Sequence, residues 1–125
     1  MSNGRINDSK DLFVWQYAME LARIVYVLAD RLPHNERNRL ADQLRRAVGS
    51  IGANIAEGNA RRYRRDYIRY LKTAYSSCKE VEHHLLMAEH VRLLHREDVA
   101  DALALAARIA RMLNALVRRL NEPRA

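Results

Sequence analysis

Apolar residues recur every three or four positions along most of the chain, which is the spacing of one face of an α-helix. No segment shows the strict alternation of a half-buried strand. Four periodic stretches are separated by short segments at Pro33, at Gly58 and at "RLLHRED" (92–98). Short connections between long helices favour antiparallel neighbours. The sequence therefore predicts an all-α fold, an antiparallel up-down-up-down four-helix bundle.

The first expected helix, which starts at an N-cap Ser9 and is ended by Pro33, carries two apolar stripes. One stripe contains Leu12, Trp15, Met19, Ala22, Tyr26 and Ala29, and the other contains Val14, Ala18, Leu21, Val25, Leu28 and Leu32. A helix on the outside of a lone bundle needs only one apolar face. The second stripe indicates self-association, with candidate interface residues Leu12, Val14, Trp15 and Leu21. The pattern leaves open which stripe faces a partner.

The second expected helix runs from about Glu36 to Glu57 and has a clear core stripe of Leu40, Leu44, Val48, Ile51 and Ile55. Another face holds small residues that allow close approach of a second backbone, namely Gly49, Gly52, Ala53, Ala56 and Ala60. Gly58 fits the position just past a helix end, where a left-handed conformation is common.

Two further helices complete the predicted bundle. The third begins near Tyr63, ends near Val91 and turns inward Tyr67, Leu71, Ala74, Cys78, Val81, Leu85 and Ala88. The fourth turns inward Val99, Leu103, Ala106, Ile109, Leu113, Leu116 and Leu120. The bundle is expected to occupy residues 9–120. Residues 1–8 and 121–125 are expected to be disordered tails.

Composition limits the protein to one domain, because 125 residues are too few for two cores. The net charge of +7 favours an anionic partner, most often nucleic acid, although charge can also serve solubility alone. Cys78 is the only cysteine and is predicted to be a reduced core thiol. The N-terminus lacks the apolar segment of a signal peptide, and no run approaches the roughly 18 apolar residues of a membrane span. A cytoplasmic protein with no membrane partner is expected.

The strongest charge feature follows the second helix. Seven cations form a candidate nucleic-acid-binding stripe: Arg61, Arg62, Arg64, Arg65, Arg69, Lys72 and Lys79. Asp66 is the only acid between Arg61 and Lys72. From Arg62 to Lys79 a helix rises roughly 25 Å, which matches several nucleotide phosphates.

Two readings of this stripe remain open. Arginine suits bidentate phosphate contacts, and Tyr63 and Tyr70 are placed to stack on unpaired bases. The alternative is a solvated helix face whose tyrosines belong partly to the core. No base-reading motif is present, so any binding is expected to involve mainly the nucleic-acid backbone.

Residues with catalytic or metal-binding chemistry do not form a complete set. Glu80-x-x-His83 matches one half of the di-iron bundle motif, but no second copy exists, so no metal or cofactor is expected. His83 and His84 are therefore predicted to lie at the surface or its boundary.

The polar residues Ser50, Asn54 and Glu57 share one helical face, but no nucleophile and base pair accompanies them. Together with Gly58 they are predicted to be a structural junction. Asn54 would fix helix register. Glu57 would accept hydrogen bonds from the N–H groups that open the next helix, or pair with Arg61 or Arg62. No enzymatic activity is predicted.

Four segments in order resemble a known family: "DLFVWQYAMEL", "LADQLRRAVGSIGANIAEGNARR", "DYIRYLKTAYSSCKEVEHHL" and "RIARMLNALVRRL". It is the bacterial four-helix-bundle family of proteins encoded in intervening sequences of large-subunit ribosomal RNA genes. Accessory variability proteins of diversity-generating retroelements are related to it. The resemblance covers about Lys10 to Leu120, and its most specific residues are Gln43, Arg46, Ala47, Ser50, Asn54, Ile55, Ala56, Glu57 and Gly58. Gly52 and Tyr63 depart from the family pattern, which often has Pro or Ser at the first position and Ser or Thr at the second.

The resemblance implies a homopentameric ring with a basic surface that is proposed to bind nucleic acid. In retroelement members the ring also binds a reverse transcriptase, and no enzymatic activity is attached to the family. The first function hypothesis is thus a non-catalytic ring-forming protein that binds nucleic acid, with RNA the expected ligand. The alternative is an assembly scaffold or adaptor for a protein partner such as a reverse transcriptase.

Overall fold

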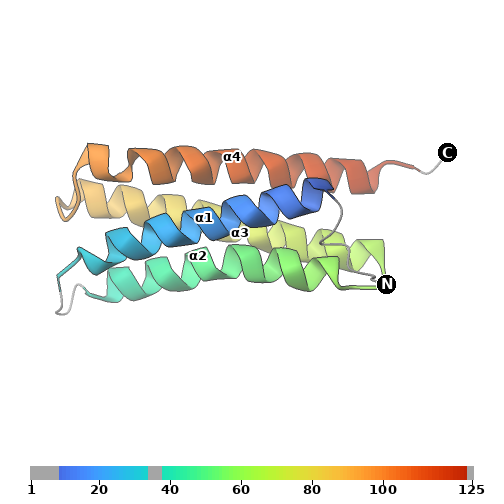
Figure 1. Ribbon diagram of the computed structural model, residues 1–125, viewed down its shortest axis with the longest axis horizontal. Helices are drawn as coiled ribbons and strands as arrows, with labels where there is room; N and C mark the ends of the chain where they lie inside the picture. The colour runs from blue at the N-terminus through green and yellow to red at the C-terminus, as the bar shows by residue number, and fades with distance from the viewer. Residues whose placement is uncertain (1–8, 34–37, 124–125) are drawn as a thin grey trace.

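Four α-helices make up the structure, a computed structural model that describes residues 9–33 and 38–123, without the side chains of 9–12 and 38. The helices are α1 (Ser9–Asp30), α2 (Asn38–Asn59), α3 (Arg64–His90) and α4 (Arg96–Asn121). Successive helices run in opposite directions along the long axis (Figure 1). The prediction of an all-helical fold with four helices is confirmed, and no strand occurs in the described part of the chain. Of the tails expected at 1–8 and 121–125, residues 1–8 and 124–125 lie outside it, whereas Asn121 is the last residue of α4 and not part of a tail.

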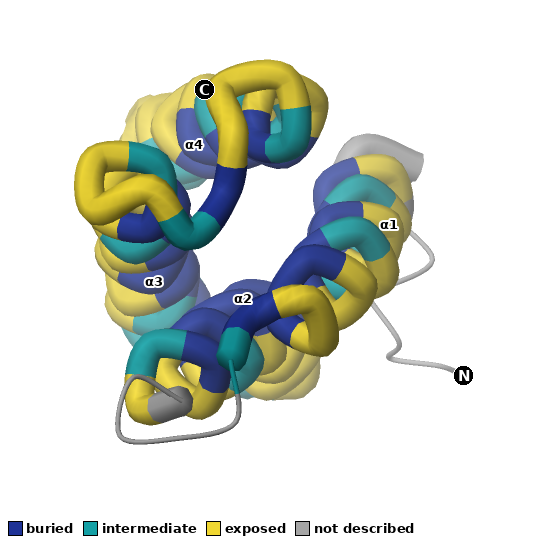
Figure 2. The backbone as a smooth tube through the Cα atoms, turned by 90° about the vertical axis from the view of Figure 1, so that its left-hand side faces the viewer, coloured by how far each residue is buried: buried dark blue, intermediate teal, exposed yellow. Residues whose placement is uncertain are grey.

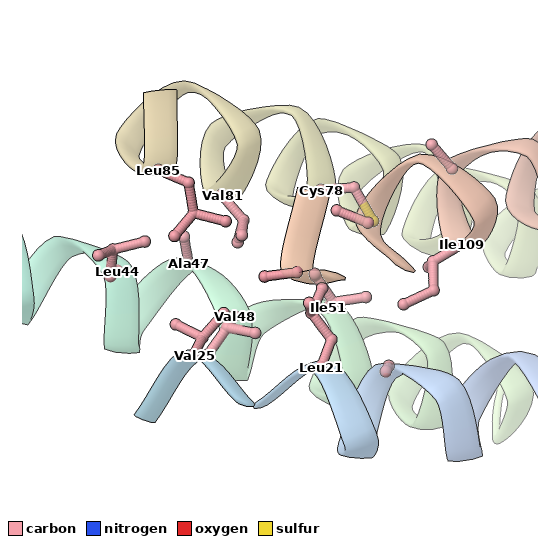
Figure 3. Close-up of a cluster of buried hydrophobic side chains, with 14 of the residues drawn as sticks. Leu21, Val25, Leu44, Ala47, Val48, Ile51, Cys78, Val81, Leu85 and Ile109 are labelled. Carbon is pink, nitrogen blue, oxygen red and sulfur yellow. The ribbon is translucent and has the colours of Figure 1, made fainter. Parts of the chain in front are cut away.

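The core fills the space between the four helices. Each helix packs against two neighbours, in the cyclic order α1, α2, α3, α4. Figure 2, which looks along the bundle, shows the buried positions of every helix turned inward. Side chains from all four helices interdigitate in the middle of the bundle, among them Leu21, Ile51, Val81 and Ile109 (Figure 3). Burying each such aliphatic side chain contributes about 1.5–3 kcal/mol.

The predicted core stripes of α2, α3 and α4 are almost entirely buried. Leu40, Leu103 and Leu120 are the exceptions, because they lie partly exposed at the edge of the core. Cys78 is fully buried, and this burial raises the pKa of its thiol to about 12. The thiol therefore stays protonated at neutral pH, where it is a poor nucleophile.

The two stripes of α1 have different environments. The stripe that runs from Val14 to Leu32 is buried in the core. The other stripe is only partly covered, since the exposed fractions of Met19 and Tyr26 are 48% and 47%. Phe13 and Val27 are also more than half exposed. The surplus apolar surface of α1 is therefore real, and it is divided between two sides of the helix, with Met19 and Tyr26 toward α2 and Phe13 toward α4.

This arrangement corrects the candidate interface residues. Val14 and Leu21 are 1% and 0% exposed within the bundle, so they belong to its own core and not to a contact between subunits. The sequence pattern could not separate the two stripes, because both have helical spacing. Trp15 is partly buried, and Leu12 lies outside the described side chains.

Gly52 shows where α1 approaches α2. A Cβ atom built on this buried glycine would lie 3.4 Å from Met19 Sδ and 3.7 Å from Trp15 Nε1. Trp15 and Met19 thus cover the predicted small-residue face at this one point. Gly49, Ala53, Ala56 and Ala60 of that face remain exposed.

Arginine side chains join helices at both ends of the bundle. Arg31, just after α1, pairs with Asp98 of α4 at 3.2 Å. The backbone N–H of His95 donates to the same carboxylate at 2.9 Å, and these two interactions lower the pKa of Asp98. At the other end, Arg64 of α3 donates to the Leu120 carbonyl at 2.9 Å and to the Glu122 carbonyl at 3.4 Å. None of the described helices is long and apolar enough to span a membrane.

Candidate nucleic-acid interface

The predicted basic stripe begins at the turn between α2 and α3. The helix α3 starts with Tyr63 as its N-cap, in an extended conformation and without a capping hydrogen bond from its side chain. A tyrosine cannot reach back to the first N–H groups as Ser or Thr does. Asp66 supplies a negative charge in the first turn, where the helix dipole favours it.

Tyr70 gathers two of the predicted cations. The guanidinium carbons of Arg61 and Arg69 each lie 5.0 Å from the centre of its ring. Arg61 also donates to the Tyr70 hydroxyl at 3.0 Å and pairs with Glu57. Arg69 pairs with Asp66 at 3.4 Å. Tyr70 is thus engaged by protein cations, which argues against its expected role as a stacking platform for bases.

Two further cations hold contacts within the protein. Arg64 binds backbone carbonyls at the end of α4, so its guanidinium ties α3 to α4. Lys79 pairs with Glu82 at 2.8 Å, and this hydrogen bond raises the pKa of Lys79. Its ammonium group also lies 5.9 Å from the centre of the Tyr75 ring.

The remaining three cations are Arg62, Arg65 and Lys72. All three are exposed, and none forms an ion pair with a described residue. Arg65 and Lys72 line a shallow depression on the outer side of α3, together with Ile68, Arg69, Thr73 and Ser76. They are seven residues apart, which places them two helical turns and roughly 10 Å apart along the helix.

A second group of cations, which the sequence pattern did not single out, lies on α4. Arg108, Arg111, Arg118 and Arg119 are exposed on this helix. The available signal was composition, because residues 102–121 contain these four arginines and no acid. Arg108 lies over the ring of Tyr17 from α1, at 4.6 Å from its centre.

Ser50 and Asn54 of the predicted junction are brought together with Ser77 of α3. The amide of Asn54 donates to the Ser50 carbonyl at 2.8 Å and to the Ser50 hydroxyl at 2.9 Å. The Ser77 hydroxyl donates to the Ser50 hydroxyl at 2.9 Å. This cluster connects α2 with α3. Glu57 lies outside it, because its exposed carboxylate pairs with Arg61.

Gly58 corrects one prediction. It lies inside α2, and no glycine among the described residues has a positive φ. A Cβ atom at Gly58 would lie 2.6 Å from Tyr70 Cβ and 3.0 Å from Tyr67 Cδ1. The glycine is therefore needed for close packing of α3 on α2, and not for a left-handed helix end. The adjacent Asn59 is buried and donates to the Tyr67 hydroxyl at 3.2 Å.

The histidines form no metal site within the described part of the chain, where no three His, Cys, Asp or Glu side chains come together. Glu80 faces His84 at 3.5 Å, although the motif had drawn attention to His83. The rings of His83 and His84 make an edge contact, with centres 5.4 Å apart.

The bundle and the junction between α2 and α3 agree with the comparison to known families. Residues 10–115 match the model of the 23S rRNA-intervening sequence protein family. The chain belongs to this family. The match includes both the junction and the basic stripe of α3, and so confirms the resemblance seen in the sequence.

A solved structure supports the same assignment. It is the crystal structure of a Bacteroides thetaiotaomicron protein of the S23 ribosomal protein family, described as having unknown function. The two chains are 25% identical with a TM-score of 0.81, and the similarity covers 87% of this chain and 98% of the other. No curated protein matches the sequence.

Two glycine substitutions, compared with each other, test the packing of α3 on α2. Gly58→Ala is expected to destabilise the bundle by about 1–3 kcal/mol, because the new methyl group meets the rigid Cβ of Tyr70. Gly49→Ala is the matched control, since it is helical, exposed and faces open space. That change should stabilise the protein by about 0.5–1 kcal/mol through helix propensity. Urea unfolding measures both, and equal stability of the two variants would refute the packing role.

The polar junction makes a second stability prediction. Asn54→Ala removes the amide that binds Ser50 and should cost about 1 kcal/mol. Glu57→Ala removes only an exposed pair between the end of α2 and the adjoining turn and should cost less than about 0.5 kcal/mol. Thermal unfolding followed by circular dichroism compares them. A larger loss for Glu57→Ala would mean that Glu57, and not the serine–asparagine cluster, secures the junction.

Proposed function

We propose that this protein is a non-catalytic, ring-forming protein of the bacterial cytoplasm that binds RNA through contacts with phosphates. The observation that carries the proposal is the set of exposed cations Arg62, Arg65 and Lys72, which form no ion pair with a described residue. The nearby acid Asp66 is already paired with Arg69. The net charge of +7 and a family named for 23S rRNA support RNA as the ligand.

The paired cations add to this surface. Arg61, Arg69 and Lys79 form salt bridges within one helix or its adjoining turn, and the cation of each pair is at least partly exposed. An exposed pair of this kind contributes about 0–1 kcal/mol, so a phosphate is able to compete for the cation. Arg64 has a different role, since its guanidinium holds the carbonyls that end α4.

Assembly into a homo-oligomer is the second part of the proposal. Phe13, Met19, Tyr26 and Val27 leave a large apolar surface exposed along α1. Apolar surface of this extent is typical of contacts between proteins. Self-association would cover it, and a pentameric ring is the form that the family resemblance implies. The same surface supports the alternative function, an adaptor for a protein partner such as a reverse transcriptase.

The phosphate-binding proposal predicts the effect of charge removal. The triple variant Arg62→Gln, Arg65→Gln and Lys72→Gln should fold normally, because all three side chains are exposed. Its affinity for structured RNA should fall, and the slope of log affinity against log salt should become shallower by roughly 0.7–0.9 per lost phosphate contact. Fluorescence anisotropy at several salt concentrations gives both quantities.

The matched control removes the same charge from other exposed positions, with Arg23→Gln, Arg46→Gln and Arg96→Gln. This variant should keep most of the affinity if the site lies on α3. Equal loss in the two variants would mean that only net charge matters. Unchanged affinity and salt slope in the test variant would refute the α3 site and leave the adaptor function.

The assembly proposal predicts a mass well above the 14.5 kDa of one chain. Light scattering after size exclusion should give a multiple of this mass, five for a pentamer. Phe13→Glu with Val27→Glu places charges in the exposed apolar surface and should lower the mass while helical content is kept. Ala104→Glu, exposed on α4, is the control. A monomeric wild-type protein at micromolar concentration would contradict the assembly.

A further inference from the structure

The exposed cations of α3 have counterparts on the neighbouring helix. Arg64 binds the carbonyls of Leu120 and Glu122, so the start of α3 lies beside the end of α4 (Figure 1). The two helices run antiparallel. Arg65 is therefore level with the end of α4, near Arg118. Lys72 lies two turns further along α3, at the level of Arg111, which lies two turns back along α4.

All four of these cations are on the outside of the bundle. Each is exposed, and none forms an ion pair with a described residue. On the same helices the buried side chains, such as Leu71 and Leu113, face the core. Arg65, Lys72, Arg111 and Arg118 thus form a surface of two adjacent rows, here called the two-helix basic face.

The dimensions of this face follow from helix geometry. Cations seven residues apart on one helix are separated by roughly 10 Å, and packed helix axes lie about 8–10 Å apart, so the two outward-facing rows are at least that far from each other. Few acids oppose the charge, because Asp66 is paired with Arg69, Glu82 is bonded to Lys79 and residues 102–121 contain no Asp or Glu, so that Glu122 is the one acid at the end of α4. The face is broad and predominantly positive, and the depression on it is shallow.

The aromatic residues on α3 are not available to stack on bases. Tyr67 is buried, Tyr70 is in contact with Arg61 and Arg69, and Tyr75 is partly buried beside Lys79. Tyr63 is exposed, but by helical register it lies on the Tyr67 and Tyr70 side of the helix and not on that of Arg65. Sites for single strands depend on exposed aromatic platforms, which this face lacks.

We propose that the two-helix basic face binds a double-helical nucleic acid, with its two rows of cations contacting phosphates on both strands. This inference rests on the proposed function and adds to it the ligand's form and the α4 residues Arg111 and Arg118. Recognition through phosphates and helical shape requires no base contacts, in agreement with a face of cations alone. The required chemistry is a duplex backbone, which RNA and DNA both supply.

The test compares the nucleic-acid affinities of two variants, each lacking one row of cations, with that of a control variant. Arg65→Gln with Lys72→Gln removes the α3 row, and Arg111→Gln with Arg118→Gln removes the α4 row. Arg46→Gln with Arg96→Gln removes the same charge elsewhere. The probes are an RNA duplex of about 20 base pairs, a DNA duplex of the same sequence and one of the single strands. Fluorescence anisotropy gives affinities at several salt concentrations.

Each row variant should bind duplex at least about fivefold more weakly than wild type, with a salt slope shallower by roughly 1.8 for two lost contacts. Wild type should bind the single strand more weakly than duplex, and the α4 variant should bind the single strand as wild type does. The control variant should bind every probe as wild type does. Whichever duplex binds more tightly, RNA or DNA, is the type of nucleic acid that the face recognises.

Two results would overturn the inference. One is duplex binding by the α4 variant that equals wild type while the α3 variant loses affinity, which would leave the proposed function intact on α3 alone. The other is single-strand binding as tight as duplex binding. Failure of the wild-type protein to bind any probe would instead refute the proposed function itself.

Discussion

The close contact of Tyr67 and Tyr70 with Gly58 determines how α3 is rotated about its own axis. Both aromatic side chains lie where the Cβ of any other residue at position 58 would be. Tyr67 is buried there and accepts a hydrogen bond from the buried Asn59. Once this side of α3 faces α2, the opposite side must face solvent. Arg65 and Lys72 are on that opposite side, so the packing contact also positions the exposed charge.

A series of short-range interactions then divides six of the seven cations of the stripe into two groups. Arg61, Arg69 and Lys79 each have a carboxylate within reach and an aromatic ring beside them. Arg62, Arg65 and Lys72 have no such partner among the described residues. A phosphate that binds the first group must replace weak contacts within the protein. A phosphate that binds the second group meets no such competition. Net charge alone does not reveal this difference.

Much of the fold was predictable because it depends on periodicity. Stripes such as Leu71, Ala74, Cys78 and Val81 repeat at helical spacing and are buried as expected. Gly58 was misassigned because a helix end and a close helix contact both select glycine, and only the position of Tyr70 distinguishes them. Val14 and Leu21 were misassigned because both stripes of α1 have the same period.

The candidate site was less predictable for a related reason. The seven cations of the α3 stripe are evident in the sequence, but their partners depend on side-chain positions. Arg64 binds carbonyls that lie more than 50 residues away in the chain. The α4 row is likewise separated from α3 in sequence, and only the antiparallel packing of the two helices brings Arg118 to the level of Arg65 along the bundle. The local sequence pattern shows which segments are basic, whereas the packing of helices decides which cations share one surface.

The two proposed surfaces are compatible because of the order of the helices. The helices α1 and α3 are not neighbours, since each packs against α2 and α4. A contact between subunits through Phe13, Met19 and Val27 of α1 would therefore leave the outer side of α3 uncovered. On α4, Arg108 leans toward Tyr17 of α1, whereas Arg111 and Arg118 lie on the outer side of the helix, further from α1. An oligomer built through α1 would thus present one basic face from every subunit. Several weak phosphate-binding faces on one particle bind a long duplex far more tightly than a single face does, provided that the duplex reaches more than one of them.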